Sequence, residues 1–182
     1  MKIGIVGIGV VGSTIKYGFE KLGHKVLTHD TRHYTSIEDV KDTDVVFICV
    51  PTPSMQRGKC NVHIVEDVVK ELNSIDYNGV IAIKSTVEPG TTDKLKKKYK
   101  DKTICYVPEF LRERCSVADF TENHDVCIIG TDSDDVFKII KKSHGKYPKK
   151  FVKVTETEAE LAKYFNNVFA ATLITFANNF YE

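Results

Sequence analysis

The chain has 182 residues, of which 42% are apolar and 28% charged, enough to bury the core of one full domain. Its formal net charge is +1, so the charge favours neither a nucleic acid nor a membrane surface as partner. No apolar stretch reaches transmembrane length, and the five cysteines form no C-x-x-C pair, which predicts a cytoplasmic protein with reduced thiols and no metal site.

The first predicted element is a strand over residues 2–6, followed at once by Gly7, Gly9 and Gly12 at G-x-G-x-x-G spacing. The first glycine suits a tight turn, the second lets a pyrophosphate approach the backbone, and the third lets helix and strand pack closely. An amphipathic helix pattern begins inside the glycines, so phosphates would lie at a helix N-terminus, where free N–H groups favour anions. The alternative is a purely structural turn in an α/β protein.

The next predicted strand, residues 25–29, ends at Asp30, about twenty residues after the glycines. A carboxylate at this place accepts hydrogen bonds from the adenine ribose of NAD and repels the extra phosphate of NADP. Arg32 follows two residues later and weakens this discrimination. NAD is the predicted cofactor.

Strand and helix patterns then alternate as far as residue 154. The predicted strands cover residues 44–50, 79–84, 102–107, 125–130 and 151–154, and the predicted helices cover residues 36–41, 61–72, 92–99 and 133–142. This alternation predicts an α/β fold with a doubly wound, mostly parallel, Rossmann-like sheet over residues 1–154. Residues 155–182 are predicted to be a long C-terminal helix, because they contain neither Gly nor Pro.

Polar side chains follow three of these strands directly. Thr52 follows the strand at 44–50, Thr86 the strand at 79–84, and the charged segment 108–113 the strand at 102–107. Loops beyond the carboxyl ends of parallel strands line the ligand crevice, so Thr52 is expected to meet the cofactor. The alternative is that both threonines only cap their loops.

The last helix has a wide apolar face, which either packs across the domain or is exposed for a partner. The residues of this face are Leu161, Phe165, Val168, Phe169, Leu173, Phe176 and Phe180.

Five motifs in this order resemble the UDP-glucose/GDP-mannose 6-dehydrogenase family of nucleotide-sugar dehydrogenases. They are GIVGIGVVG (4–12), VFICVPTP (46–53), KSTVEPGTT (84–92), VPEFLRE (107–113) with Asp119 after it, and EAELAKYFNNVFAATLITFANN (158–179). The resemblance implies oxidation of the C6 alcohol of a UDP-glucose or GDP-mannose type substrate to a carboxylate, with two NAD and a cysteine thiohemiacetal. It also implies a homodimer formed through the last helix.

The resemblance assigns roles to individual residues. Thr86, Glu109, Lys163 and Asn167 would be catalytic, with Glu109 a candidate base for thioester hydrolysis. Lys163 and Asn167 share one helix face at i, i+4 spacing, so both can reach one substrate. The predicted cofactor-binding set is Gly7, Gly9, Val10, Val11, Gly12, Asp30, Arg32, Val50, Pro51, Thr52, Thr86 and Glu113. The predicted substrate-binding set is Glu109, Phe110, Leu111, Arg112, Glu113, Lys163 and Asn167.

The chain departs from the family pattern in three ways. The family's nucleophilic cysteine lies in a G-x-G-F-G-G-x-C segment that these 182 residues do not contain, so the chain is expected to be the N-terminal cofactor domain with the start of a central helix. The insertion between the second and third strands is short, and Asp125 stands near a family Arg.

Other interpretations stay open. In one interpretation the solvated surface charges include Glu109 and Glu113. In another, Lys163 and Asn167 are ordinary residues on the surface of a helix. At the level of function, the alternatives are a non-catalytic NAD-binding or dimerisation module and a dehydrogenase of the 6-phosphogluconate or 3-hydroxyacid type. The VPEFLRE and KYFNN segments argue against the dehydrogenase alternative.

Overall fold

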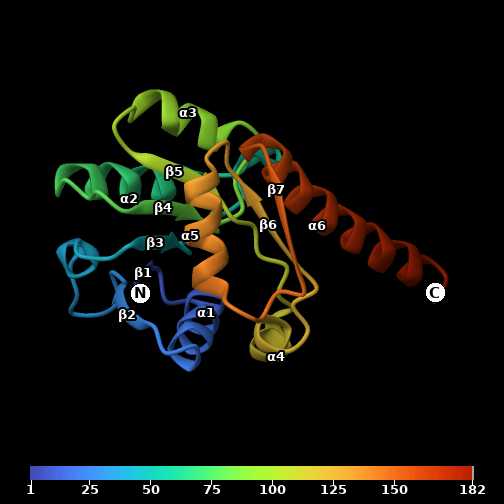
Figure 1. The fold of residues 1–182 in the computed structure, drawn as a ribbon. Coiled ribbons are helices and arrows are strands. Elements are labelled where there is room, and N and C mark those ends of the chain that lie inside the picture. The colour runs from blue at the N-terminus through green and yellow to red at the C-terminus, as the bar shows by residue number, and fades with distance from the viewer. Residues whose placement is uncertain (182) are drawn as a thin grey trace.

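The computed structural model describes residues 1–181, the side chain of Arg57 excepted, and contains a seven-stranded sheet in the order β2-β1-β3-β4-β5-β6-β7 (Figure 1). The strands are β1 (Lys2–Val6), β2 (Lys25–His29), β3 (Val45–Ile48), β4 (Val80–Ile83), β5 (Thr103–Tyr106), β6 (Val126–Gly130) and β7 (Lys150–Val154). The helices are α1 (Val10–Lys21), α2 (His63–Ser74), α3 (Thr91–Lys98), α4 (Ser116–Thr121), α5 (Asp134–His144) and α6 (Glu156–Asn179). Short 3₁₀ turns cover Ile37–Val40, Gln56–Gly58 and Glu113–Cys115.

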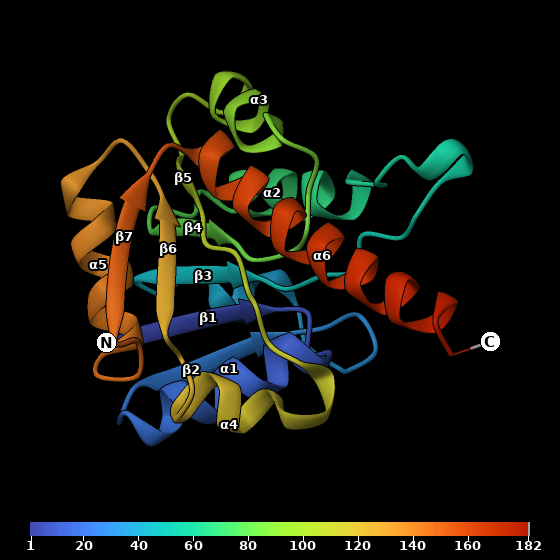
Figure 2. The same ribbon diagram turned by 90° about the vertical axis from the view of Figure 1, so that its right-hand side faces the viewer.

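Strands β1 to β5 are parallel, which confirms the predicted Rossmann-like arrangement. Strand β1 lies between β2 and β3, so the strand order changes direction there, and ligands of such sheets bind outside the carboxyl ends at this place. Strand β6 pairs antiparallel with β5 at Tyr106 and Gly130, and β7 is parallel to β6. Figure 2 shows β6 and β7 rising steeply across the direction of β1 and β3.

Helices cover both faces of the sheet, which explains why β3 and β4 consist of buried apolar residues. On one face, Val65, Val69 and Leu72 of α2 pack with Leu95 of α3. On the other face, α1, α4 and α5 enclose a second cluster around Phe19 and Phe120.

Helix α4 is an element that the sequence pattern did not predict. It packs against α1, where a Cβ added to Gly18 would lie 2.4 Å from Cε1 of Phe120. The hydroxyl of Thr14 in α1 donates to the hydroxyl oxygen of Ser116 at 2.8 Å. The predicted helix at 36–41 is a 3₁₀ turn, in which the Ser36 N–H donates to the Asp39 carboxylate at 2.8 Å.

Helix α6 is held to the domain by its first turns. Glu156 pairs with Lys96, while Glu160 accepts hydrogen bonds from the N–H and the hydroxyl of Thr92, at 2.8 and 2.6 Å. Since Lys96 lies late in α3 and Thr92 early, α6 runs antiparallel to α3. Ala159 packs tightly enough that a Cβ added to Gly130 would lie 2.8 Å from the Ala159 Cβ.

Beyond these turns α6 projects past the sheet (Figure 2), and its large apolar side chains are exposed. The apolar face is therefore uncovered in the described chain. No helix among residues 1–181 is long and apolar enough to cross a membrane. The division into residues 1–154 and 155–182 stays a prediction.

Candidate active site

The three glycines after β1 are required for different reasons. Gly7 has φ +92°, and a Cβ there would lie 2.6 Å from the carbonyl oxygen of Cys49. A Cβ on Gly12 would lie 1.9 Å from the carbonyl oxygen of Gly7. A Cβ on Gly9 would meet nothing within 4 Å. The fold therefore requires Gly7 and Gly12, whereas the open space at Gly9 suits a ligand that approaches the backbone.

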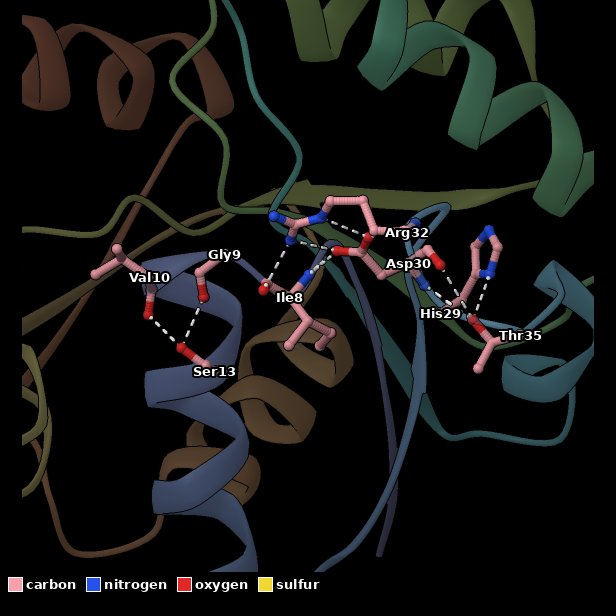
Figure 3. Close-up of polar contacts among 8 residues, drawn as sticks. All are labelled: Ile8, Gly9, Val10, Ser13, His29, Asp30, Arg32 and Thr35. Atoms are coloured by element: carbon pink, nitrogen blue, oxygen red, sulfur yellow. Dashed lines mark hydrogen bonds and ion pairs between the residues drawn. The ribbon is translucent and has the colours of Figure 1, made fainter.

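Gly9 is also the N-cap of α1, and the first helical bond runs from the Ser13 N–H to its carbonyl at 2.9 Å. The N–H groups of Val10, Val11 and Gly12 thus precede the hydrogen-bonded part of the helix. These donors and the helix dipole form an anion site of the kind that a pyrophosphate occupies. The Ser13 hydroxyl donates to the Gly9 carbonyl, on the helix side of this turn (Figure 3).

Asp30, directly after β2, binds both the glycine turn and Arg32 (Figure 3). Its Oδ2 accepts from the Ile8 N–H at 2.7 Å, and its Oδ1 accepts from the Arg32 N–H at 2.9 Å. The guanidinium adds two bonds, Nε to Oδ1 and Nη2 to Oδ2, each 2.9 Å long. The hydrogen bond from the Arg32 side chain is the main reason why the pKa of Asp30 is lowered.

A first hollow of 480 Å³ opens where β1, β2 and β3 end. Its lining includes Gly7, Gly9, Asp30, Arg32, Val50 and Pro51, all predicted as cofactor-binding. Helix α2 forms the opposite wall with Ile64, Asp67, Val68 and Glu71, which the sequence reasoning missed. The glycine turn, the acidic residue after β2 and an apolar slot next to them fit the adenosine end of a dinucleotide.

A second hollow of 250 Å³ adjoins the first, and Cys49, Val50 and Pro51 line both. Its remaining lining residues are Val11, Thr52, Lys84, Ser85, Thr86, Glu109, Leu111 and Lys163. Gly9, Thr52, Thr86 and Lys163 therefore line one depression made of two adjoining hollows, although they come from four separate segments of the chain.

Lys163 reaches this second hollow from α6. Its Nζ donates to the backbone carbonyl of Glu109 and lies 5.5 Å from the ring centre of Phe110. Burial lowers the pKa of Lys163. Asn167, one turn later, lines a third hollow of 410 Å³ together with Thr52 and Thr86. The predicted common face of Lys163 and Asn167 is thus the face that borders these hollows.

Glu109 is buried, with 5% of its surface exposed, so the interpretation as a solvated surface charge is wrong for this residue. Its Oε2 lies 3.1 Å from Nζ of Lys84, and its Oε1 accepts from the Phe110 N–H at 2.9 Å. The Lys84 side chain is 1% exposed. Burial is the largest single influence on the pKa of Lys84 and lowers it, but the attraction and hydrogen bond of Glu109, together with the nearby thiols of Cys127 and Cys49, outweigh burial, and the pKa is raised. Sequence reasoning gave Lys84 no role, although it directly follows β4.

The side chains of four other predicted residues line neither the first nor the second hollow. The Arg112 side chain pairs with Asp119, with Nη2 to Oδ1 at 2.7 Å. Arg112 and Phe110 line a separate hollow of 660 Å³, which adjoins the second hollow at Glu109 and Leu111. Val10 and Glu113 are exposed and line none of the four hollows described here. The roles of all these residues stay predictions.

The cysteines differ in their surroundings. Burial raises the pKa of Cys49 and that of Cys127 to about 12, so both thiols are protonated at neutral pH. Cys60, to which the sequence reasoning assigned no role, lines the third hollow, and its thiol donates to the Thr86 carbonyl at 3.4 Å.

Comparison with known proteins agrees with this geometry. The family described as "UDP-glucose/GDP-mannose dehydrogenase family, NAD binding domain" matches residues 28–146. A UDP-glucose 6-dehydrogenase of Haloferax volcanii is 28% identical over 98% of the chain, and an uncharacterized protein of Methanocaldococcus jannaschii is 34% identical over 96%. The solved structure of a UDP-glucose dehydrogenase from Pyrobaculum islandicum superimposes on 98% of the chain with a TM-score of 0.87 and 25% identity.

These relatives are longer than the chain. It spans 53% of the Haloferax protein, 22% of the Methanocaldococcus protein and 51% of the Pyrobaculum structure. Because the aligned regions cover 96–98% of the chain, they include the glycine turn and most of α6.

Proposed function

Since the chain belongs to the UDP-glucose/GDP-mannose dehydrogenase family, whose matching domain binds NAD, we propose that it is the NAD-binding part of a nucleotide-sugar 6-dehydrogenase. The proposed reaction oxidises the C6 hydroxyl of a UDP-glucose or GDP-mannose type substrate toward the carboxylate. Bound NAD would supply the hydride acceptor.

The observation that carries this proposal is the pair of adjoining hollows that Gly9 and Lys163 line, one at each end. Its first part has the glycine turn, the helix N-terminus and Asp30, as a dinucleotide requires. Its second part joins the first at Pro51 and contains Thr86, Glu109 and Lys163. A nicotinamide at the junction would thus lie beside polar and charged groups that can act on an alcohol.

Each of these groups has a distinct proposed task. The Lys163 ammonium, aimed at the Glu109 carbonyl, stabilises the negative charge that develops on the substrate oxygen. Asn167 adds a neutral donor on the same helix face. Thr86 contacts the cofactor and holds the water near the reacting carbon. Glu109 is the base that would activate this water to attack the thioester of the family's cysteine, which lies outside these 182 residues, so that the carboxylate and the free thiol are released.

The test is NADH formation by the purified chain with UDP-glucose and, separately, with GDP-mannose. We expect NADH with one of them from the first oxidation, of the C6 alcohol to the aldehyde, in which the hydride passes to NAD and no cysteine takes part. The rate should fall about a hundredfold on Lys163→Ala, as for other donors to a developing oxyanion. Lys138→Ala is the control, because the Lys138 side chain lies on the exposed side of α5, in an ion pair with Asp135. NAD binding without NADH formation would contradict the enzyme proposal and favour the non-catalytic module.

We further propose that a second copy of the chain covers the exposed face of α6. Phe165 is 74% exposed and Phe169 58%, and their rings stack with centres 6.3 Å apart. A row of large exposed apolar residues of this length is typical of an interface. Sedimentation should give a dimer for the chain and a monomer for Phe165→Glu/Phe169→Glu. A monomer at every concentration of the unchanged chain would contradict the proposed dimer.

The proposed location is the cytoplasm. The five cysteines of the chain are all unpaired, as expected in a reducing compartment. Cell fractionation with an antibody against the chain tests this location.

A further inference from the structure

The carboxylate of Asp30 has no acceptor position left for a ligand. An ionised carboxylate offers about four lone-pair sites on its two oxygens. Four N–H groups already occupy them: Ile8 N–H and Arg32 Nη2 on Oδ2, and Arg32 N–H and Arg32 Nε on Oδ1. The hydroxyls of an adenine ribose would therefore meet an acceptor whose sites are filled.

The four donors differ in how easily they can leave. The Ile8 and Arg32 N–H groups belong to the backbone next to β1 and β2 and are fixed by the fold. The other two belong to the Arg32 side chain, which is 66% exposed. Water and salt screen an exposed guanidinium, and the Asp30 carboxylate, whose side chain is 7% exposed, keeps its two backbone donors when the guanidinium leaves. The guanidinium is thus the replaceable part of the arrangement.

The guanidinium also lies across the first hollow. Its Nη2 donates to the Ile8 carbonyl at 3.0 Å as well as to Asp30, so it bridges the glycine turn and the residue after β2 (Figure 3). Arg32, Gly9 and Asp30 line the same hollow, which is where the ribose would lie. Arg32 and the ribose therefore compete for one position.

The opposite wall of the hollow offers the guanidinium other partners. Asp67 and Glu71 are exposed, lie at i, i+4 spacing on α2 and line the hollow. A guanidinium that leaves Asp30 can turn toward these carboxylates and stay charged and hydrogen-bonded.

We propose that Arg32 occupies the ribose position of the NAD site and that NAD binds by displacing its guanidinium from Asp30. In this exchange the two ribose hydroxyls take the places of Nε and Nη2, while the Ile8 and Arg32 backbone donors stay bound. Arg32 then weakens the affinity for NAD, the opposite of its predicted role as a cofactor ligand. This inference rests on the proposed position of the adenosine end in the first hollow.

The test is the dissociation constant of NAD, measured by titration calorimetry on the full chain. We expect Arg32→Ala to bind NAD about two- to fivefold more tightly, the range that removal of an exposed ion pair allows. Arg32→Lys keeps the charge but loses the planar fork, and we expect a smaller gain. Lys138→Ala removes one positive charge from a remote exposed pair and should leave the affinity unchanged.

A spectroscopic measurement tests the displacement itself. The Arg32 Nε–H resonance, identified by its absence in Arg32→Lys, should shift and exchange faster with solvent once NAD is bound. A resonance that NAD leaves unchanged overturns the proposal. So does an Arg32→Ala chain that binds NAD equally well or more weakly.

Asp30→Ala separates this proposal from the proposed function. If Asp30→Ala weakens NAD binding about tenfold and Arg32→Ala does not strengthen it, only the displacement is wrong. If Asp30→Ala leaves NAD binding unchanged, the adenosine end lies elsewhere, and the proposed cofactor position fails as well.

Discussion

Two acidic residues at the same edge of the sheet each face a basic side chain, but under opposite conditions. Asp30 follows β2 and pairs with Arg32, whose side chain is 66% exposed. Glu109 follows β5 and pairs with Lys84, whose side chain is 1% exposed. The same chemical pairing can therefore be an exchangeable contact at one end of the depression and a permanent part of the interior at the other.

Burial determines this difference. The exposed Arg32 guanidinium is screened and regains water when its pair breaks, and Asp30, whose side chain is 7% exposed, keeps its two backbone N–H donors. A buried pair has lost that water, so removing one partner leaves an isolated charge in a medium that solvates it poorly. The expected effects of substitutions fall in the same order.

The largest effect is expected for Lys84→Met, which leaves the Glu109 carboxylate buried without its cation. The free energy of unfolding should fall by about 3–5 kcal/mol, measured by urea denaturation at neutral pH. Lys84→Met combined with Glu109→Gln should recover part of this loss, because no unpaired charge is left. A loss below about 1 kcal/mol in the single variant would mean that the two pairs do not differ as described.

The next largest effect concerns the glycines at the Asp30 end. Gly12→Ala should lower the free energy of unfolding by about 3 kcal/mol, because its Cβ meets the Gly7 carbonyl. Gly9→Ala should lower the free energy of unfolding by less than about 1 kcal/mol, because its Cβ enters open space. It should still weaken NAD binding, because the pyrophosphate is proposed to occupy that space. Denaturation and calorimetry on both variants check this. Equal losses of stability would remove the argument that the space at Gly9 serves a ligand.

A smaller effect is expected for Arg32→Ala on stability alone. Since the guanidinium is exposed, the thermal midpoint of Arg32→Ala should stay close to that of the unchanged chain and well above that of Lys84→Met. Differential scanning calorimetry of the three proteins side by side measures this. A midpoint as low as that of Lys84→Met would contradict the comparison.

The smallest effect concerns a third pair, Arg112 with Asp119. The hydrogen bond from Arg112 lowers the pKa of Asp119 from 3.8 to about 2. Because the pKa is lower in the folded state, the pair stabilises the fold above about pH 4, and this contribution is lost as the pH falls toward 2. Arg112→Ala should therefore show a shallower loss of thermal midpoint between these pH values. Identical profiles would exclude the pair as a source of acid sensitivity.

The sequence was sufficient for the parts of the fold that rest on local patterns. Continuous apolar runs predicted β3 and β4. The spacing of the glycines and of Asp30 predicted the cofactor-binding residues of the first hollow. Each of these patterns can be read from a short stretch of the chain. Helix α4 was missed because its six residues, Ser116–Thr121, are too few to show a helical period. The direction of β6 was not predictable either, because strand patterns contain no information on pairing direction.

The candidate site was predictable only in part, for a related reason. A lysine at a strand end is usually exposed, and the partner of Lys84 lies in a different segment, so its burial had no local signal. In the sequence, Asp67 and Glu71 look like the carboxylates found on the solvent-facing side of any helix. Their relation to the hollow depends on how α2 lies over the carboxyl ends of β1 and β3.

Because α6 runs antiparallel to α3, the polar residues of α6 lie near the carboxyl edge of the sheet. Helices that connect parallel strands, such as α3, start at the carboxyl edge and return to the other edge, so a helix antiparallel to α3 advances toward the ligands (Figure 2). The hydrogen bonds from Thr92 to the Glu160 carboxylate then fix the position of α6 along its own axis. A slip by one helical turn would move Lys163 by about 5.4 Å, the rise of one turn, and out of reach of the Glu109 carbonyl. Glu160, which lines none of the four hollows, thus sets the position of Lys163 along the helix axis relative to the proposed cofactor site.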